Sequence, residues 1–192
     1  METIVHRIFE AEHLKQVKHE WVRLAGVQFP DSVAEHSFVA MHIGRYLAIL
    51  EWVDPYKVIA TLLFHDLPEA RIGDLHRIAT RYIKGKDDAE QQIFQEQMLG
   101  MPWAEDATQL FQDFEMKRTA IAQVAKDADY LENAFQAKIY VEQGHSKAQI
   151  WIDNVGKALK TSHWKQLFSA LISSSASDRR EKTHLMYIPQ SV

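Results

Sequence analysis

The chain contains no cysteine among its 192 residues. Disulfide bonds and thiolate-bound zinc are therefore excluded, and any bound metal must be held by nitrogen and oxygen atoms. The absence of cysteine also fits a reducing compartment. With 46% hydrophobic and 25% charged residues, a chain of this length can bury a sizeable core without disulfides.

Long apolar runs and long basic runs are also missing. No segment approaches the uninterrupted apolar length of a membrane helix or of a secretion signal. The formal net charge is -4, and no cluster of lysine and arginine indicates a groove for a nucleic-acid polymer. We therefore expect a cytoplasmic protein that has neither a membrane nor a nucleic-acid polymer as a partner.

Glycine and proline are scarce, with 7 and 5 residues, and most of them fall between segments of helical periodicity. This distribution predicts long helices with short connections, and we find no alternating strand pattern and no internal repeat. The expected fold is all-α, with one helical domain over 1–172 and a serine-rich linker and tail over 173–192. The expected helices cover 11–24, 32–50, 54–66, 88–99, 103–141 with one interruption, 147–160 and 163–172.

The helix over 32–50 has a clear start. Ser32 and Glu35 delimit the sequence SVAE, a capping box in which the two side chains satisfy free backbone N–H groups. Apolar residues that recur at helical spacing predict its buried face: Val39, Ile43, Leu47 and Leu50.

The stretch LLFHDLPEARIGDL, residues 62–75, places polar residues directly in line with an apolar run. His65 and Asp66 follow the three apolar residues, and Glu69 and Asp74 come soon after, with Pro68 expected to kink or end the helix. Burying an ionisable group without a partner is costly. A divalent ion would explain these residues, because an adjacent histidine and aspartate at a helix end can both bind it.

Two side chains are not enough for such an ion, so further ligands must come from other helices. His36 lies on the expected apolar face of the helix over 32–50, and Asp129 lies within the helical stretch VAKDADYLENAF. Together with His65 and Asp66 they would surround one bundle interior with nitrogen and oxygen ligands. Taken singly, each has an ordinary alternative, since a histidine on an apolar face is more often a hydrogen-bonded core residue and an aspartate a cap or ion-pair partner.

The order of these residues along the chain, H…HD…D, resembles the motif of the HD phosphohydrolase superfamily. More narrowly, the chain is similar to 5′-deoxynucleotidases of the YfbR/HDDC2 type, which carry a V-A-E-H helix, then H-D-x-x-E-x-x-x-G-D, then K-x-x-D-x-x-E. The matching pieces here are SVAEHSF, HDLPEARIGDL and KDADYLENAFQAK, in the same order. The resemblance covers about residues 12–142 of the chain.

The resemblance implies an all-helical HD domain that cleaves the phosphate monoester of a deoxynucleoside 5′-monophosphate. It implies a homodimer, for which the apolar tail LMYIPQSV is a candidate contact. Two catalytic residues are implied: Glu69, which would activate the attacking water, and Asp74, which would lie near the sugar and help select deoxyribose. One divalent metal ion is implied, of which Mn, Co, Fe, Ni, Zn and Mg all remain open. Its ligands by resemblance are His36, His65, Asp66 and Asp129.

The chain departs from this subgroup just before the V-A-E-H helix. Family members usually carry R-x-G-W there, with the arginine near the phosphate, whereas this chain has VKHEW over 17–21. Lys18 takes the place of the arginine, and lysine holds a phosphate as a point charge and not as a bidentate fork. The expected substrate-binding residues are Lys18, Trp21, Asp74 and Arg77. Arg23, Arg81 and Lys84 are further candidates for binding the phosphate, and the sequence does not rank them.

Two other functions stay open at the level of sequence. The VKHEW departure favours an HD phosphohydrolase acting on another phosphoester, such as a nucleoside triphosphate or a cyclic dinucleotide. A non-enzymatic helical protein with a structural metal is the third hypothesis, although Glu69 is not needed for coordination. Asp74 also fits a turn residue or a helix cap. Six histidines outside the metal set are expected at the surface: His6, His13, His19, His145, His163 and His184.

Overall fold

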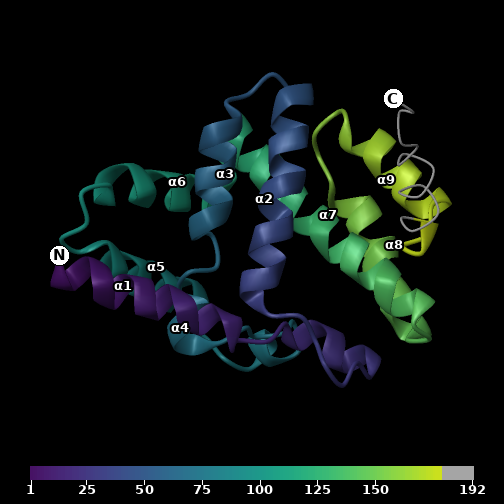
Figure 1. Cartoon of the computed structure of the whole chain (residues 1–192), viewed down its shortest axis with the longest axis horizontal. Coiled ribbons are helices and arrows are strands. Elements are labelled where there is room, and N and C mark those ends of the chain that lie inside the picture. The colour runs from purple at the N-terminus through teal and green to yellow at the C-terminus, as the bar shows by residue number, and fades with distance from the viewer. Residues whose placement is uncertain (179–192) are drawn as a thin grey trace, which may run out of the picture.

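The computed structural model describes residues 1–178 of the chain (Figure 1). Within this part the only strand-like pairing is an isolated antiparallel bridge between Lys18 and Ser32, so the all-α expectation is confirmed. The elements, in chain order, are α1 Glu2–Glu12, η1 His13–Lys15, η2 Glu20–Ala25, α2 Val33–Leu50, α3 Pro55–Phe64, α4 Glu69–Ile72, η3 Ala79–Arg81, α5 Lys86–Met98, α6 Ala104–Met116, α7 Ala120–Glu142, η4 Ser146–Ala148, α8 Gln149–Ala158 and α9 Trp164–Ser173.

Three helices form the centre of the bundle. Helices α2, α3 and α7 contact one another pairwise, α6 packs on α3 and α7, and α8 packs on α7. Figure 1 shows α2 and α3 in the middle, α8 and α9 on one side, and α1, α5 and α6 on the other. The largest core cluster lies between the central helices and includes Leu47, Leu62, Phe114 and Leu131. Because burial of these apolar side chains stabilises the fold, the three helices give a rigid frame to any side chain that points between them.

The start of α2 is confirmed as a capping box. The backbone N–H of Glu35 donates to Oγ of Ser32 over 3.2 Å, and the backbone N–H of Ser32 donates to the Glu35 carboxylate over 2.6 Å. This reciprocal pair satisfies donors that the first helical turn leaves unpaired.

The predicted buried face of α2 is half right. Ile43 and Leu47 are buried, but Val39 is 39% exposed and Leu50 is 44% exposed, so their assignment to the core is wrong. The face that contacts α3 and α7 is lined instead by small residues, among them Ala40, Gly44 and Ala48. Small residues let helix backbones approach closely, and of the four predicted apolar side chains only Ile43 and Leu47 share this buried face with them.

The predicted helix over 11–24 is wrong in its position. The first α-helix is α1, which ends at Glu12, and the following segment has only short 3-10 turns around an extended piece. The extended backbone is imposed from elsewhere in the chain: the N–H of Val33 donates to the carbonyl of Val17 over 2.9 Å, and that of His19 to Asp31 over 3.0 Å. This long-range pairing overrides the local helical pattern.

The other expected helices are confirmed, with small shifts at their ends. Asp54 caps α3 through its side chain, Pro55 occupies the first helical position, and α3 ends at Phe64. The interruption between 103 and 141 lies at the junction of α6 and α7, where Lys117 adopts a left-handed conformation. The predicted tail over 173–192 begins at the last residue of α9. Residues 179–192 of this tail lie outside the described residues.

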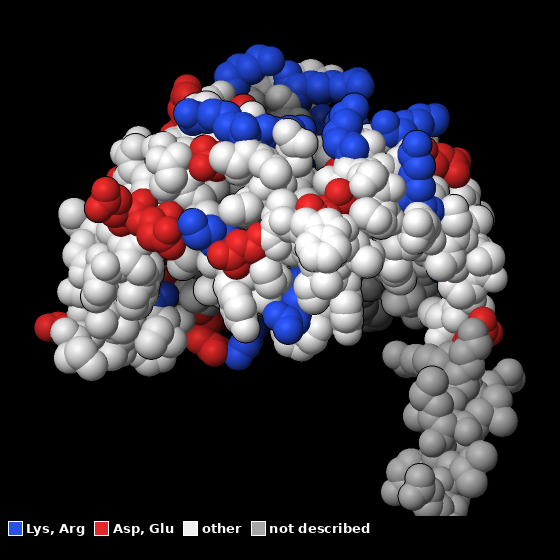
Figure 2. All heavy atoms as spheres, turned by 90° about the horizontal axis from the view of Figure 1, so that it is seen from above, with Lys and Arg blue, Asp and Glu red and all other residues white. Residues whose placement is uncertain are grey.

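Two expectations about partners, a membrane and a nucleic-acid polymer, concern the helices and the surface of the described residues. None of the helices within residues 1–178 has the length and apolar character needed to cross a membrane. Figure 2 shows lysine and arginine side chains gathered along one edge of the molecule, with acidic side chains distributed over the rest of that face. Both signs of charge are therefore present on this face, and the formal net charge of the whole sequence is -4.

Candidate active site

His65 and Asp66 follow directly after the end of α3, next to the central helices. After Phe64 the chain makes two consecutive turns, in which Leu67 N–H donates to Phe64 O over 3.2 Å and Glu69 N–H to Asp66 O over 3.0 Å. Pro68 stands at the junction before the one-turn helix α4, as expected for a residue that cannot continue a helix. His65 is thus buried between the central helices, and Asp66 lies beside it.

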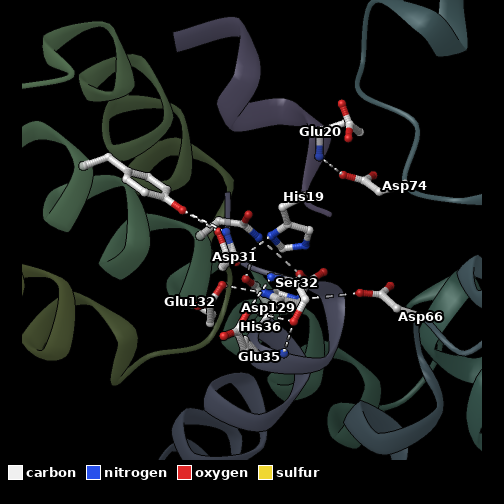
Figure 3. A network of polar contacts seen from close by, with 12 residues as sticks. His19, Glu20, Asp31, Ser32, Glu35, His36, Asp66, Asp74, Asp129 and Glu132 are labelled. Carbon is white, nitrogen blue, oxygen red and sulfur yellow. Dashed lines mark hydrogen bonds and ion pairs between the residues drawn. The ribbon is translucent and has the colours of Figure 1, made fainter. Parts of the chain in front are cut away.

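The four predicted metal ligands come together in one cluster, of which Figure 3 labels His36, Asp66 and Asp129. His65 Nε2 lies 3.0 Å from Asp66 Oδ2, and His36 Nε2 lies 3.3 Å from His65 Nε2. His36 Nε2 also lies 3.6 Å from Asp66 Oδ2 and 3.4 Å from Asp129 Oδ1. These atoms come from α2, from the turn after α3 and from α7. The arrangement that the spacing of the motifs only suggested is therefore present in three dimensions.

The donor set fits a divalent first-row metal. Bonds of about 2.0–2.2 Å to such an ion place neighbouring ligand atoms about 3 Å apart, close to the distances in the cluster. Nδ1 of His36 contacts the carboxylate of Glu132, and Nδ1 of His65 lies 2.8 Å from the carbonyl of Leu62. Each imidazole therefore turns Nε2 toward the cluster, as histidine ligands of metals do. Glu132 has no role predicted from the sequence, although it follows Asp129 by one helical turn.

The electrostatics of the cluster favour ionised carboxylates. Burial alone would raise the pKa of Asp66, but the charges of His65 and His36 lower it below its usual range. Burial likewise opposes ionisation of Asp129, and Lys126 together with His36 lowers its pKa. Nζ of Lys126 lies 3.2 Å from Asp129 Oδ2. Both carboxylates are thus in the form that binds a cation.

Glu69 lies beside the cluster, and Lys86 offsets only part of the cost of burying its carboxylate. One carboxylate oxygen, Oε2, has no hydrogen-bond partner, and Oε1 lies 3.8 Å from Nζ of Lys86. Burial and the negative charges of Asp66 and Asp74 raise the pKa of Glu69 well above its usual value, while Lys86 lowers it. A buried carboxylate with an unpaired oxygen next to a ligand cluster is available for proton transfer.

Asp74 connects the motif to the segment that departs from the family pattern. Its Oδ2 accepts a 2.7 Å hydrogen bond from the backbone N–H of Glu20 (Figure 3). Burial raises the pKa of Asp74, and the nearby His19 lowers it. The side chain is half-buried, so one part of it is held by protein while another remains accessible.

The structure does not bring the other predicted substrate-binding residues into contact with the ligand cluster. Lys18 is half-buried and pairs its backbone with Ser32, and its charge contributes to the lowered pKa of Glu35. Trp21 packs against Trp151, with ring centroids 4.7 Å apart, in a separate core cluster. Arg77 is exposed. Their roles toward a substrate stay predictions.

His19 is the functional candidate that the sequence missed. Its expected place at the surface is wrong, because the side chain is only 5% exposed and its ring lies 4.5 Å from the ring of His36, centroid to centroid. No local pattern reveals this position, since the burial follows from the pairing of 17–19 with 31–33. Lys86, next to Glu69, is a second residue that the sequence did not single out.

Comparison with known proteins places this site in a family. The profile of the HD domain matches residues 11–171. The 5′-deoxynucleotidase HDDC2 of Dictyostelium discoideum is 28% identical over 178 residues, covering 87% of this chain and 93% of that protein. A conserved hypothetical protein from Pyrococcus furiosus superposes with a TM-score of 0.74 at 26% identity, covering 88% of this chain and 99% of the other.

A more distant structure shares the fold alone. It is the HD phosphohydrolase DatZ of cyanophage S-2L, bound to dA and one catalytic Zn2+ ion. Its TM-score is 0.51 at 14% identity, and the match covers 78% of this chain and 82% of that one.

The fold, the cluster of histidines and aspartates and these similarities together define an all-α hydrolase of the metal-dependent phosphohydrolase class. More closely, the chain belongs to the HD domain family, whose profile matches most of its length. The resemblance carried by the three sequence motifs is therefore confirmed at the level of the family.

Proposed function

We propose that this HD phosphohydrolase releases phosphate from deoxynucleoside 5′-monophosphates with the help of one divalent metal ion. The observation that carries the proposal is the cluster of four nitrogen and oxygen donors with a buried glutamate beside it. The similarity to a protein named 5′-deoxynucleotidase supports the substrate class. The bound ion would supply positive charge to the phosphoryl group and lower the pKa of a water molecule. It would be held by His36, His65, Asp66 and Asp129.

Glu69 is the proposed acceptor of the proton that the attacking water loses. Its unpaired Oε2 can take that proton without giving up an existing hydrogen bond. Lys86, 3.8 Å from Oε1, opposes the effect of burial and helps keep the carboxylate ionised. The burial of Glu69 thus matches the role of a base that works in a water-poor site.

Asp74 is the proposed contact to the sugar. The hydrogen bond from Glu20 N–H fixes the carboxylate, so that it presents a rigid surface to a bound nucleoside. A fixed group of this kind discriminates more strongly than a mobile one, because a mismatched hydroxyl cannot be accommodated by rotation. We therefore assign the preference for deoxyribose over ribose to Asp74.

Phosphate recognition is assigned to the cations that surround the cluster. We propose Lys18 for this role because it adjoins His19, which lies next to the ligands. Lys86 is the second candidate, because it already lies against Glu69. Either lysine would act as a point charge on the phosphoryl oxygens, in place of the arginine fork of related proteins. Trp21 and Arg77 stay as proposed contacts at the edge of the substrate site.

The proposal is tested by metal-dependent phosphate release. The protein is stripped with a chelator, reloaded with Mn2+ or Co2+, and assayed with all deoxy- and ribonucleoside 5′-monophosphates side by side. We expect release from the deoxy substrates, at least about tenfold faster than from the ribo substrates, and none without metal. A metal-loaded protein that is inactive on every monophosphate would overturn the substrate assignment.

The VKHEW segment supports one alternative substrate class within the same chemistry. Because the arginine fork is absent, a phosphoester other than a terminal monophosphate is the second candidate. A panel of nucleoside triphosphates and cyclic dinucleotides separates the two: triphosphate release or a linear dinucleotide favours the alternative, and inorganic phosphate from a monophosphate favours the first.

We also infer a homodimer, as the resemblance implies. Aromatic side chains on α2 and α3 are largely exposed, including Phe38, Tyr46 and Tyr56, and apolar surface of this kind often marks an interface. Light scattering after size-exclusion chromatography should give twice the chain mass of 22.2 kDa. A mass equal to that of one chain would contradict the inference.

A further inference from the structure

A third histidine lies at the metal cluster. The ligand atoms of His36, His65 and Asp129 all lie within 4.8 Å of one another, and those of His19, His36 and Asp66 do the same. The two groups share His36. His19 is buried with it and belongs to neither the predicted ligand set nor the proposed base. Figure 3 shows His19 beside Asp31, above His36 and Asp129, on the side that also carries Asp74.

Each of the three histidines has an acceptor oxygen close to its Nδ1 atom, although the His19 pair is not aligned as a hydrogen bond. Nδ1 of His36 contacts the carboxylate of Glu132, and Nδ1 of His65 contacts the carbonyl of Leu62. Nδ1 of His19 lies 3.1 Å from Oδ2 of Asp31. An imidazole whose Nδ1–H points to such an acceptor keeps the lone pair of Nε2 available, which is the arrangement of most histidine ligands in metal sites. For His19 the acceptor within reach is Asp31, and a small rotation of the ring would align Nδ1–H with it.

Asp31 is held by hydrogen bonds that favour its ionised form. Tyr140 Oη donates to its Oδ1 over 2.8 Å, and the backbone N–H of Asp31 donates to Tyr140 Oη over 3.1 Å. Burial would raise the pKa of Asp31, but His19 and Tyr140 lower it below its usual value. Tyr140 thus holds Asp31 in place, with its Oδ2 atom 3.1 Å from Nδ1 of His19.

The distances agree with an extra position around the same ion. With bonds of about 2.1 Å, two ligand atoms on adjacent corners lie about 3 Å apart and two on opposite corners about 4.2 Å apart. Four of the six pairs among the predicted ligands lie 3.0 to 3.6 Å apart, which are adjacent spacings. The ligand atom of His19 lies within 4.8 Å of those of His36 and Asp66, so it is close to two of the four predicted ligands.

We propose that His19 is a fifth protein ligand of the divalent metal ion, oriented by Asp31. The inference rests on the proposed metal site and goes beyond it, since the resemblance implies only two histidine ligands. A third imidazole shifts the preference of the site toward Fe2+, Co2+, Ni2+ or Zn2+ and away from Mg2+, which prefers oxygen. It also leaves fewer coordination positions to solvent and substrate.

The first test measures metal binding and needs no substrate. Co2+ is titrated into chelator-stripped wild-type protein, His19→Asn and the exposed control His42→Asn, and the visible spectrum and affinity are recorded. We expect His19→Asn to bind Co2+ at least about tenfold more weakly and with a changed spectrum, and to lose much less affinity for Mg2+. The control should match wild type. An unchanged spectrum and affinity in His19→Asn would overturn the proposal.

A second measurement uses only the wild-type protein, so that it stands even where His19→Asn does not fold. In the NMR spectrum of the Co2+-loaded protein, each coordinated imidazole gives one exchangeable, strongly shifted Nδ1–H signal. Three such signals are expected, and two would overturn the proposal. Because neither experiment depends on phosphate release, a wrong substrate class would leave both results interpretable.

Discussion

Glu69 is the residue whose environment is hardest to explain as structure alone. A buried carboxylate oxygen without a hydrogen-bond partner lowers stability, and the neighbouring Asp66 and Asp74 add like charges. Only Lys86 offsets these effects, from 3.8 Å. Residues held in such unfavourable surroundings concentrate at active sites, where the cost is tied to function.

Replacing Glu69 with glutamine keeps the shape of the side chain and removes the proton acceptor. We expect kcat to fall by about 10²- to 10⁴-fold, with the metal content unchanged because Glu69 is outside the ligand set. Phosphate release and metal per protein are the two readouts. Glu105→Gln, at an exposed position in α6, is the matched control. Full activity in metal-loaded Glu69→Gln would refute the assigned role.

Replacing Asp74 with asparagine tests the assignment of sugar selectivity. The amide is similar in size but carries no charge and can present an N–H to the substrate. We expect the ratio of kcat/KM for deoxy over ribo substrates to fall by about tenfold, with the metal still bound. Asp88→Asn, exposed near the start of α5, should leave the ratio unchanged. An unaltered ratio in Asp74→Asn would assign selectivity to another residue.

At the scale of elements, the close approach of α2 and α3 is decided by one glycine. A Cβ at Gly44 would meet Val58 Cγ1 at 2.9 Å and would come still closer to Leu62 Cδ1. Both partners are fully buried in α3. Since α2 carries His36 and α3 leads into His65, this contact sets the distance between the two imidazoles.

Gly44→Ala is therefore expected to destabilise the protein although alanine favours helices. Overpacking of a tight core contact costs about 1–3 kcal/mol in unfolding free energy, which exceeds the gain of about 1 kcal/mol from helix propensity. Denaturant unfolding gives the value directly. The double variant Gly44→Ala with Leu62→Ala is the control, because removing the leucine side chain makes room and should reduce the penalty caused by the alanine. A neutral or stabilising single variant would contradict the close packing.

Helix α1 is attached to the bundle mainly through polar contacts. It contains no buried residue, yet the carboxylate of Glu10 accepts hydrogen bonds from Arg71 in α4, Gln97 in α5 and Arg7 in α1. Burial opposes ionisation of Glu10, but these donors prevail and lower its pKa to about 2. The one carboxylate thus connects three helices.

Because the pKa of Glu10 is lower in the folded state than its ordinary value of 4.5, ionisation of Glu10 stabilises the fold above that pH. The contribution is lost as the pH falls from about 4.5 to about 2, where the folded protein also takes up the proton. Glu10→Gln should be less stable than wild type near neutral pH, and the difference should shrink across this acid range. Denaturant midpoints measured against pH provide the check. A constant difference at all pH values would show that the carboxylate charge is not responsible.

At the scale of the whole molecule, the metal site joins segments that are far apart in the chain. Its proposed ligands come from α2, the turn after α3 and α7, which also form the central core. Without an ion, Asp66 and Asp129 leave two like, desolvated charges at this junction, both close to His36. Binding of an ion to the folded state alone would stabilise the entire bundle.

We expect the midpoint of thermal unfolding to rise on metal loading. At a free metal concentration of about 100 times Kd, the linkage amounts to about 2.7 kcal/mol. Calorimetry of chelated and reloaded wild-type protein measures the shift, and His36→Asn is expected to lose most of it. An equal shift in His36→Asn would mean that the ion binds elsewhere.

The sequence by itself was sufficient for the helices from residue 32 onward and for four of the side chains in the cluster. Capping at Ser32 and Asp54 and the scarcity of glycine and proline are local signals, so they survive folding unchanged. The spacing of His65, Asp66 and Glu69 is equally local. The order of the motifs then added His36 and Asp129 to the predicted metal ligands. Local pattern is informative here because most contacts that define a helix lie within one turn of the chain.

Tertiary structure alone decided which of these faces are buried and which other residues join the site. Val39 and Leu50 stay exposed because the buried face of α2 runs through Ala40, Ile43, Leu47 and Ala48, to one side of them. His19 enters the cluster because backbone pairing draws 17–19 against 31–33, and the same pairing prevents a helix over 11–24. Such contacts join residues distant in sequence, and their free energy depends on neighbours that no short stretch of sequence can specify.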